Sequence, residues 1–117
     1  MPGLRIRDGK DISWKTVRDA VPERAANYER SLADSKVAHH DPASTDELQL
    51  VEADYLPGVK IPIHSHKEAE IMYVLAGSIV MDGRELRPGS SVFIAPGTPY
   101  GFSAGSEGVR LAFFSSK

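Results

Sequence analysis

Two histidines and a glutamate lie close together in the stretch GVKIPIHSHKEAEIMYVLAG, residues 58–77. His64 and His66 are two residues apart, so on an extended strand both side chains point to the same face. Glu70 follows at the start of the next expected strand, which can return beside the first. Two imidazoles and one carboxylate make up the 2-His-1-carboxylate type of metal site, which leaves positions open for substrate, water or dioxygen. The spacing predicts a site for one divalent transition metal per chain, with Fe, Mn, Ni, Co and Zn as the candidates.

The alternative interpretation of these residues is structural. A histidine pair on a strand can simply face solvent, and Glu70 can form a surface ion pair with Lys67. The metal interpretation is favoured because five residues of specified type stand at set positions within one short window, namely Gly58, His64, His66, Glu70 and Gly77. On the same strand, alternation directs Ile61 and Ile63 away from the two histidines.

Other titratable residues are left out of the expected site. His39 and His40 fall in a segment, residues 39–47, that is expected to be a polar loop. Adjacent residues on an extended chain point to opposite sides, so at most one of the two could reach the metal. Glu68 is interpreted as a solvated residue of a turn. Neither histidine nor Glu68 is therefore assigned a role.

The strand that carries Glu70 is almost continuously apolar over residues 70–77, which predicts a strand with both faces covered. The same is expected for residues 90–97. By parity, Met72 and Val74 share the face of Glu70. They either line an apolar pocket around the metal or belong to the ordinary core of a barrel.

The composition excludes several other functions. The chain has 117 residues and no cysteine, which rules out disulfides, thiolate nucleophiles and cysteine-ligated zinc. The net charge is −2, and no basic stripe typical of nucleic-acid binding is visible. The N-terminal residues are polar, and the longest apolar run, IMYVLAG, is too short to cross a bilayer. We therefore expect a soluble, cytoplasmic protein that binds a small molecule and neither nucleic acid nor a membrane.

Glycine and proline interrupt the chain at short intervals, which is typical of an all-β domain. We expect about eight strands, a number that suits a jelly-roll barrel. The barrel is expected to span residues 26–117, preceded by an irregular N-terminal arm over residues 1–25. Strands are expected within residues 26–34, 47–58, 59–66, 70–77, 90–97, 100–104 and 109–116, with a hairpin at Asp82-Gly83 within residues 78–89. In the arm, residues 5–9 are expected to form a short strand, and residues 13–21 a helical turn that Pro22 stops.

The spacing of the glycines, histidines and glutamate in residues 58–77 resembles the first motif of the cupin family, and the sequence is similar to a small single-domain cupin of the Cupin_2 type. The segment PGSSVFIAPGTPYGF resembles the second motif: Gly89 fits its opening glycine and Pro96-Gly97 its turn. Ala95 stands where proline is usual, and Tyr100 where the last metal-binding histidine is usual. The resemblance implies a double-sheet, RmlC-like β-barrel with a metal near its mouth. It assigns His64, His66 and Glu70 to the metal but provides no fourth ligand.

Three roles are open to Tyr100. A protonated phenol could hydrogen-bond a substrate or a metal-bound water and so take part in catalysis. The ring could instead pack against the barrel wall with Phe102. A nearby cation could also lower the phenol pKa from its ordinary value of ~10 and make a phenolate ligand. The first role is favoured and the third is the least favoured.

The resemblance implies a metal-dependent enzyme of the dioxygenase, isomerase or lyase kind that acts on a small organic substrate. A small oxoacid, enol or diketone-like compound is the first substrate class to test. The alternative, from another functional class, is a non-catalytic cupin that binds or senses a small ligand. Homodimerisation is also expected, because the edge strands of a short barrel need to be covered.

Overall fold

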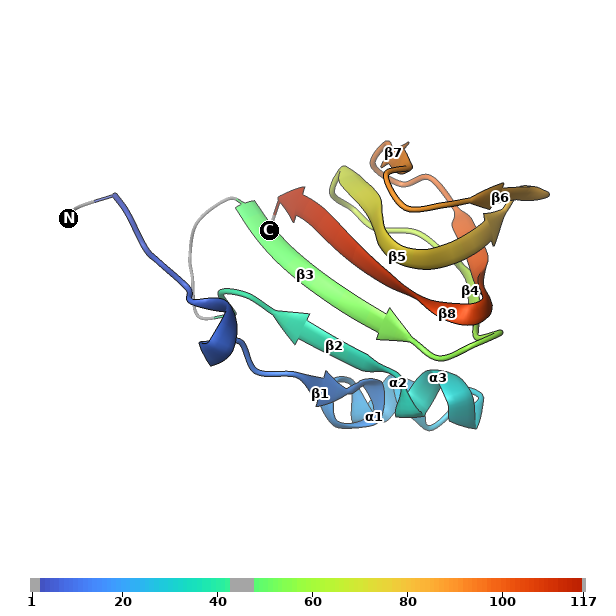
Figure 1. Cartoon of the computed structure of the whole chain (residues 1–117), viewed down its shortest axis with the longest axis horizontal. Helices are drawn as coiled ribbons and strands as arrows, with labels where there is room; N and C mark the ends of the chain where they lie inside the picture. The colour runs from blue at the N-terminus through green and yellow to red at the C-terminus, as the bar shows by residue number, and fades with distance from the viewer. Residues whose placement is uncertain (1–2, 43–47, 117) are drawn as a thin grey trace.

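The computed structural model describes residues 3–42 and 48–116. Within them eight strands form one antiparallel sheet that curls into a jelly-roll barrel (Figure 1). The strands are β1 (Lys15–Thr16), β2 (Lys36–His39), β3 (Leu48–Tyr55), β4 (Lys60–His64), β5 (Glu70–Met81), β6 (Arg84–Leu86), β7 (Ser91–Ile94) and β8 (Tyr100–Ser116). Their order is β1-β2-β3-β8-β5-β6, with β4 paired to β8 and β7 paired to β5. This confirms the all-β class and the jelly-roll fold expected from the sequence.

The long strand β8 joins the two parts of the barrel. Its first residues pair with β4, and its last residues lie between β3 and β5. The sequence analysis divided this strand in two at residues 105–108, and that prediction was wrong. The backbone stays paired through the glycine-rich segment, because Gly105 accepts a hydrogen bond from Gly58 and Val109 pairs with Gly77. Glycines here bend the strand without ending it.

The core lies between the sheet faces and is centred on β5 and β8. Met72, Val74, Ile79 and Leu111 are almost completely buried there. Met72 and Val74 therefore belong to the barrel core and do not line the cavity described below. The expectation that both faces of β5 and β7 are covered was wrong. Tyr73 and Leu75 on β5 and Phe93 on β7 are exposed, because no segment that the structure describes covers the outer face of these strands.

The turn at Asp82-Gly83 connects β5 to β6 as predicted. Both residues have positive φ, 52° at Asp82 and 74° at Gly83. Two consecutive positive φ values are the geometry of the type I′ hairpin turn, whose twist matches that of the flanking strands. The hairpin then pairs Met81 with Arg84.

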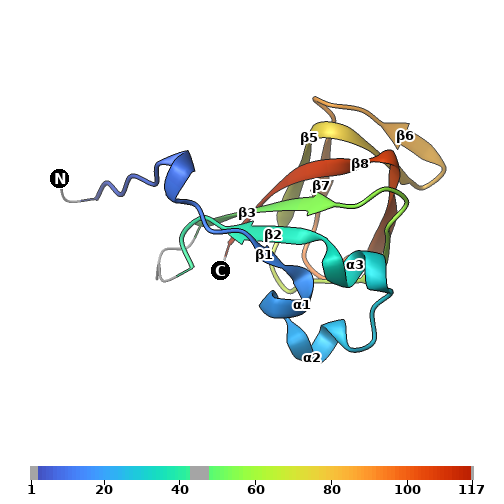
Figure 2. The same cartoon turned by 60° about the horizontal axis from the view of Figure 1, so that its bottom comes forward.

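Three short helices, α1 (Val17–Ala20), α2 (Pro22–Ala25) and α3 (Arg30–Asp34), lie beside β1 and β2 (Figures 1 and 2). The helical turn before Pro22 is confirmed as α1, with Thr16 as its N-cap. Pro22 does not end the helical region, because it takes the first position of α2, where a missing N–H costs no hydrogen bond. The described residues contain no helix long and apolar enough to span a membrane.

Two strands expected before β2 are absent from the described residues. Residues 5–9 form no strand; a 3-10 turn, Gly9–Asp11, begins at their end. Residues 26–34, expected to be a strand, contain α3. Leu32 and Ala33 of this helix are both buried, and two adjacent buried residues do not fit the alternation expected of a strand with one covered face.

Candidate functional site

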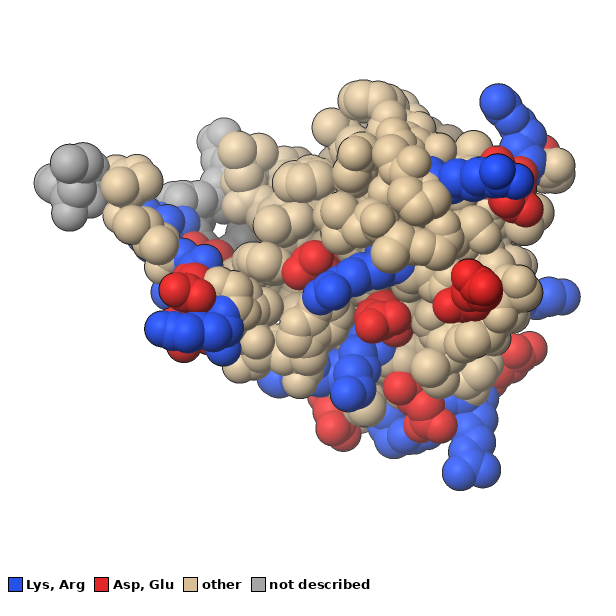
Figure 3. All heavy atoms as spheres, viewed as in Figure 1, with Lys and Arg blue, Asp and Glu red and all other residues tan. Residues whose placement is uncertain are grey.

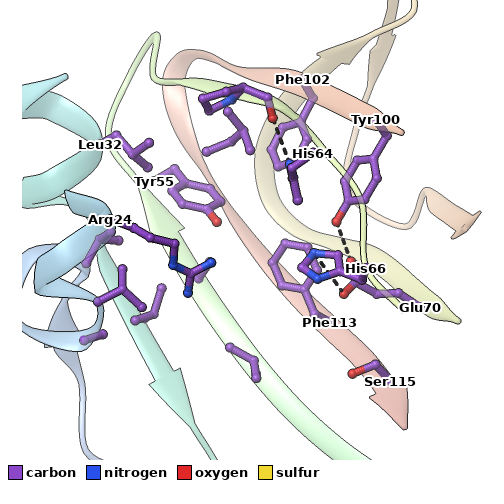
Figure 4. Close-up of a pocket in the computed structure, with 18 of the residues that line it drawn as sticks. Arg24, Leu32, Tyr55, His64, His66, Glu70, Tyr100, Phe102, Phe113 and Ser115 are labelled. Carbon is purple, nitrogen blue, oxygen red and sulfur yellow. Dashed lines mark hydrogen bonds and ion pairs between the residues drawn. The ribbon is translucent and has the colours of Figure 1, made fainter. Parts of the chain in front are cut away.

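A cavity of about 590 Å³ lies between the barrel and the three helices (Figure 4). We call one region of its wall the polar end, which consists of His64, His66, Glu70 and Tyr100. Aromatic side chains line the wall next to it, among them Tyr55, Phe102 and Phe113. The helices contribute the wall that faces the polar end across the cavity, including Arg24 of α2 and Leu32 of α3. All three residues predicted to bind a metal therefore face one cavity.

His64 and His66 both face the cavity, but they do not lie together on one regular strand as predicted. His64 is the last residue of β4, and His66 lies beyond it in the connection to β5. Their ring centroids are 4.9 Å apart and the rings are almost perpendicular, at 86°. The pairing of β4 with β8 slips between Ile61 and His64, which interrupts strict alternation. For this reason Ile61 also lines the cavity, whereas Ile63 points away as predicted and is 79% exposed.

Tyr100 is hydrogen-bonded to Glu70, an arrangement that none of the three expected roles included. Tyr100 lies opposite His64 in the β4–β8 register, with ring centroids 4.5 Å apart. Its hydroxyl donates to Oε1 of Glu70 over 2.6 Å (Figure 4). The ring also stacks on Phe102 at 6.4 Å. Burial, together with the hydrogen bond and the negative charge of Glu70, raises the pKa of Tyr100 above its ordinary value. The result is a neutral phenol that donates a hydrogen bond to a carboxylate oxygen.

We expect Tyr100 and Tyr55 to stay un-ionised until the protein unfolds in alkali. Burial and the charge of Glu70 raise the pKa of both side chains in the folded state. Their contribution to stability is therefore complete below the ordinary tyrosine pKa of ~10 and is lost as the pH rises above it. The ultraviolet absorbance of phenolate, recorded with near-ultraviolet circular dichroism, measures this. Tyr100→Phe should lower the phenolate signal only after unfolding, and a lower signal in the folded protein would contradict the prediction.

The donor atoms of the polar end are chemically suited to a divalent metal. His64 Nδ1 lies 2.8 Å from the carbonyl oxygen of Pro62, which favours a proton on Nδ1. The lone pair of Nε2 is then available to bind a metal. His66 Nε2 lies 3.9 Å from Glu70 Oε2. Two ligands that each stand ~2.1 Å from one ion are at most ~4.2 Å apart, so this pair could share an ion. Within residues 3–42 and 48–116, however, no three histidine or acidic side chains are already grouped as a metal site. Metal binding would require these side chains to move closer together.

The structure places His39 on a strand rather than in a loop, and His40 in a bend directly after it. His39 is the last residue of β2 and lines the cavity, because pairing with Val51 extends the sheet to this point. His40 Nε2 lies 2.9 Å from Glu52 Oε2, away from the cavity. The expected polar loop therefore starts later than predicted, and its residues 43–47 lie outside the described residues. Glu68, interpreted as solvated, also lines the cavity from a bend after His66.

The family model that matches the chain is the Cupin_2 model, a cupin domain, over residues 51–115. This segment contains the polar end and all of β4 to β7. The chain belongs to the cupin family. The resemblance of residues 58–77 and 88–102 to the two cupin motifs, with Tyr100 at the usual histidine position, stays a prediction from the sequence. No curated protein matches the sequence.

Solved structures with similar folds include an RmlC-like cupin from Shewanella frigidimarina NCIMB 400, at TM-score 0.71 and 19% identity, covering 97% of this chain and 91% of that one. The polyketide cyclase RemF from Streptomyces resistomycificus is similar at TM-score 0.69 and 21% identity, covering 97% and 79% of the two chains. Oxalate decarboxylase from Bacillus subtilis is similar at TM-score 0.59 and 21% identity, covering 71% of this chain and 25% of that one. Identities this low show the shared fold alone.

Proposed function

We propose that this cupin binds a small organic molecule in the 590 Å³ cavity, together with one divalent metal ion held by His64, His66 and Glu70. The observation that carries the proposal is that these three side chains and Tyr100 line the same end of one cavity. Related support comes from the oxalate decarboxylase of similar fold, whose structure is described as containing Mn(II) centres. The ion is one of Fe, Mn, Ni, Co or Zn. The choice among them depends on metal supply and site geometry as much as on the type of ligand.

A bound divalent ion would supply Lewis-acid chemistry at a carbonyl or enediolate oxygen, or dioxygen chemistry if it were iron. The protein residues have separate tasks. His64 and His66 offer neutral nitrogen donors, and Glu70 offers Oε2 because Oε1 already accepts from Tyr100. Tyr100 holds a proton at its hydroxyl next to the cavity, where it can donate a hydrogen bond to an oxygen of the substrate. Phe102 and Phe113 give that oxygen an apolar wall on one side. The activity that we propose is therefore that of a dioxygenase, isomerase or lyase on a small oxoacid, enol or diketone-like compound.

His64→Ala and His66→Ala are each expected to abolish metal uptake. Removal of an outer-shell partner alone weakens metal sites about 10–100-fold, and removal of a direct ligand should cost at least as much. Elemental analysis and equilibrium dialysis with Co²⁺ or Mn²⁺ measure the stoichiometry, which should be near one ion per chain before mutation. His40→Ala is the matched control, because His40 is paired with Glu52 away from the cavity. Equal losses in all three variants would mean that the site is elsewhere.

The alternative function is a non-catalytic, ligand-binding or sensing cupin. The absence of a preassembled three-ligand group among the described residues is the observation that favours it. The two functions are separated by treatment with a chelator. Turnover that stops on chelation, with oxygen consumption in the case of a dioxygenase, supports the enzyme. Ligand binding that is unchanged by chelation, without turnover of any tested oxoacid, supports the binding module.

We also propose that the protein forms a homodimer through the outer face of the sheet. The strand registers place Phe93 opposite Ile71, Ile71 opposite Phe114, and Phe114 opposite Leu50, so these side chains form one row on one face. Phe93 is 75% exposed and Phe114 44%. Figure 3 shows few charged side chains over β5 and β7.

Phe93→Glu should convert the proposed dimer to a monomer, because it places a charge within this apolar row. Light scattering measures the change. A wild-type protein that is monomeric at all micromolar concentrations would contradict the proposal.

A further inference from the structure

Arg24 lines the same cavity as the polar end but comes from the opposite wall. It lies on α2, next to the C-terminal residue of that helix. Figure 4 shows its guanidinium extending from the helix layer toward the cavity, with the histidines and Glu70 on the far side. The side chain is exposed to solvent as well, so a ligand that enters the cavity can reach it.

The guanidinium of Arg24 has no hydrogen bond or ion pair with any residue that the structure describes. Other arginines of the N-terminal segment differ in this respect. Arg18 is paired with Asp34 at 2.5 Å, and Arg7 with Asp41. A charged, planar group with several donors therefore faces the cavity without a hydrogen bond or ion pair to any described residue. Arginine is the side chain best matched to the two oxygens of a carboxylate.

The other charges of the cavity determine how an anionic ligand would be oriented. Glu68 and Glu70 both line the cavity, and Glu70 lies on the wall that faces Arg24 (Figure 4). In the metal-free cavity the negative charge of Glu70 disfavours an anionic group at that end, whereas Arg24 favours one at the other. Between the two ends the wall is aromatic, at Tyr55, Phe102 and Phe113. The cavity thus offers a cation, an apolar middle and a polar end that carries hydrogen-bonding groups.

From this arrangement we propose that Arg24 anchors the carboxylate of an amphipathic monocarboxylic acid, whose opposite, uncharged end lies against Tyr100 and the histidines. A single arginine balances one negative charge, which favours a monocarboxylate over a phosphate ester or a dicarboxylate. The inference narrows the substrate class of the proposed function and uses the same cavity. It assigns α2, which was expected to belong to the irregular N-terminal arm, a direct part in ligand recognition.

The test uses metal-free protein, so that the only anchor offered to an anion is a protein side chain. The probes are 3-phenylpropanoate and its neutral amide, 3-phenylpropanamide, which have the same shape and differ in charge. Binding is followed by NMR titration of wild type, Arg24→Gln, Arg24→Lys and Arg18→Gln. We expect wild type to bind the acid at least about 10-fold more tightly than the amide, as hydrogen bonds to charged groups predict. Arg24→Gln should remove this preference without weakening binding of the amide, and Arg24→Lys should retain part of it.

Arg18→Gln is the matched control, because it removes a positive charge from the adjacent helix that is already paired with Asp34. Its preference for the acid should equal that of wild type. The proposal is overturned if wild type binds acid and amide equally or binds no acid at millimolar concentration. It is also overturned if Arg24→Gln keeps the preference, or if His64→Ala removes it in the metal-free protein. Metal uptake by Arg24→Gln is measured separately and should equal that of wild type, so a failure of the metal site leaves this test intact.

Discussion

Gly77→Ala is expected to destabilise the folded protein by roughly 2–5 kcal/mol, a large part of the total for a domain of this size. Gly77 has φ of 73°, which an alanine adopts only with strain. A methyl group there would also lie 2.9 Å from the carbonyl carbon of Gly108 and closer still to its oxygen. Gly108 belongs to β8, so relief of the clash would require the β5–β8 pairing to open. Urea unfolding followed by circular dichroism measures the loss.

Gly83→Ala separates the two causes of this loss. Gly83 has almost the same φ, 74°, but no atom lies within 4 Å of the position that a methyl group would take. Only the backbone strain, about 1–2 kcal/mol, should be lost there. Equal destabilisation by the two substitutions would show that the close approach of β5 to β8 has no energetic effect. A larger loss of stability in Gly77→Ala would show that a glycine is needed at this position because β5 and β8 approach closely there.

The parts of the fold predicted correctly from the sequence are those specified by local signals. Aspartate and glycine both tolerate positive φ, so the Asp82-Gly83 pair was enough to locate the hairpin in the sequence. Helix α3 could not, because its five residues are few for a periodic pattern, and burial of Leu32 against the barrel decides its conformation. The continuity of β8 was also missed. Glycines at 105 and 108 normally suggest a break, and only the pairing partners on β3 and β5 show that they bend the strand instead.

The candidate site shows the same division between local and non-local information. His64, His66 and Glu70 lie within seven residues, and their spacing alone predicted that they face a common space. The hydrogen bond between Tyr100 and Glu70 joins residues 30 positions apart and depends on the registers of β4, β5 and β8. Arg24 had no signal at all, because nothing in the sequence indicates which wall of the barrel a short helix will cover. The parts of this site that could not be predicted are therefore the contacts between residues that are distant in sequence.

Tyr100→His is expected to strengthen divalent metal binding by about 10–100-fold. The substitution has two effects in the same direction. It removes the hydroxyl that donates to Glu70 Oε1, so that both carboxylate oxygens become available. It also places an imidazole where the cupin second motif usually has its metal-binding histidine, opposite His64 on the neighbouring strand. Competition with a chromophoric chelator for Co²⁺ measures the affinity, and the visible spectrum of bound Co²⁺ reports whether another nitrogen donor has joined the site.

Tyr100→Phe is the matched control, because it frees Glu70 without adding a ligand. Its affinity should rise by less than about 10-fold, since loss of one outer hydrogen bond is the smaller of the two changes. If Tyr100→His binds Co²⁺ no more tightly than Tyr100→Phe, position 100 does not point at the ion and the proposed geometry is wrong. If both variants bind more tightly than wild type and the histidine variant most tightly, the phenol of the natural protein keeps its metal site weak. In that case the tyrosine lowers the metal affinity but keeps a hydroxyl proton beside the cavity in which the substrate is proposed to bind, with the hydroxyl oxygen 2.6 Å from Glu70 Oε1.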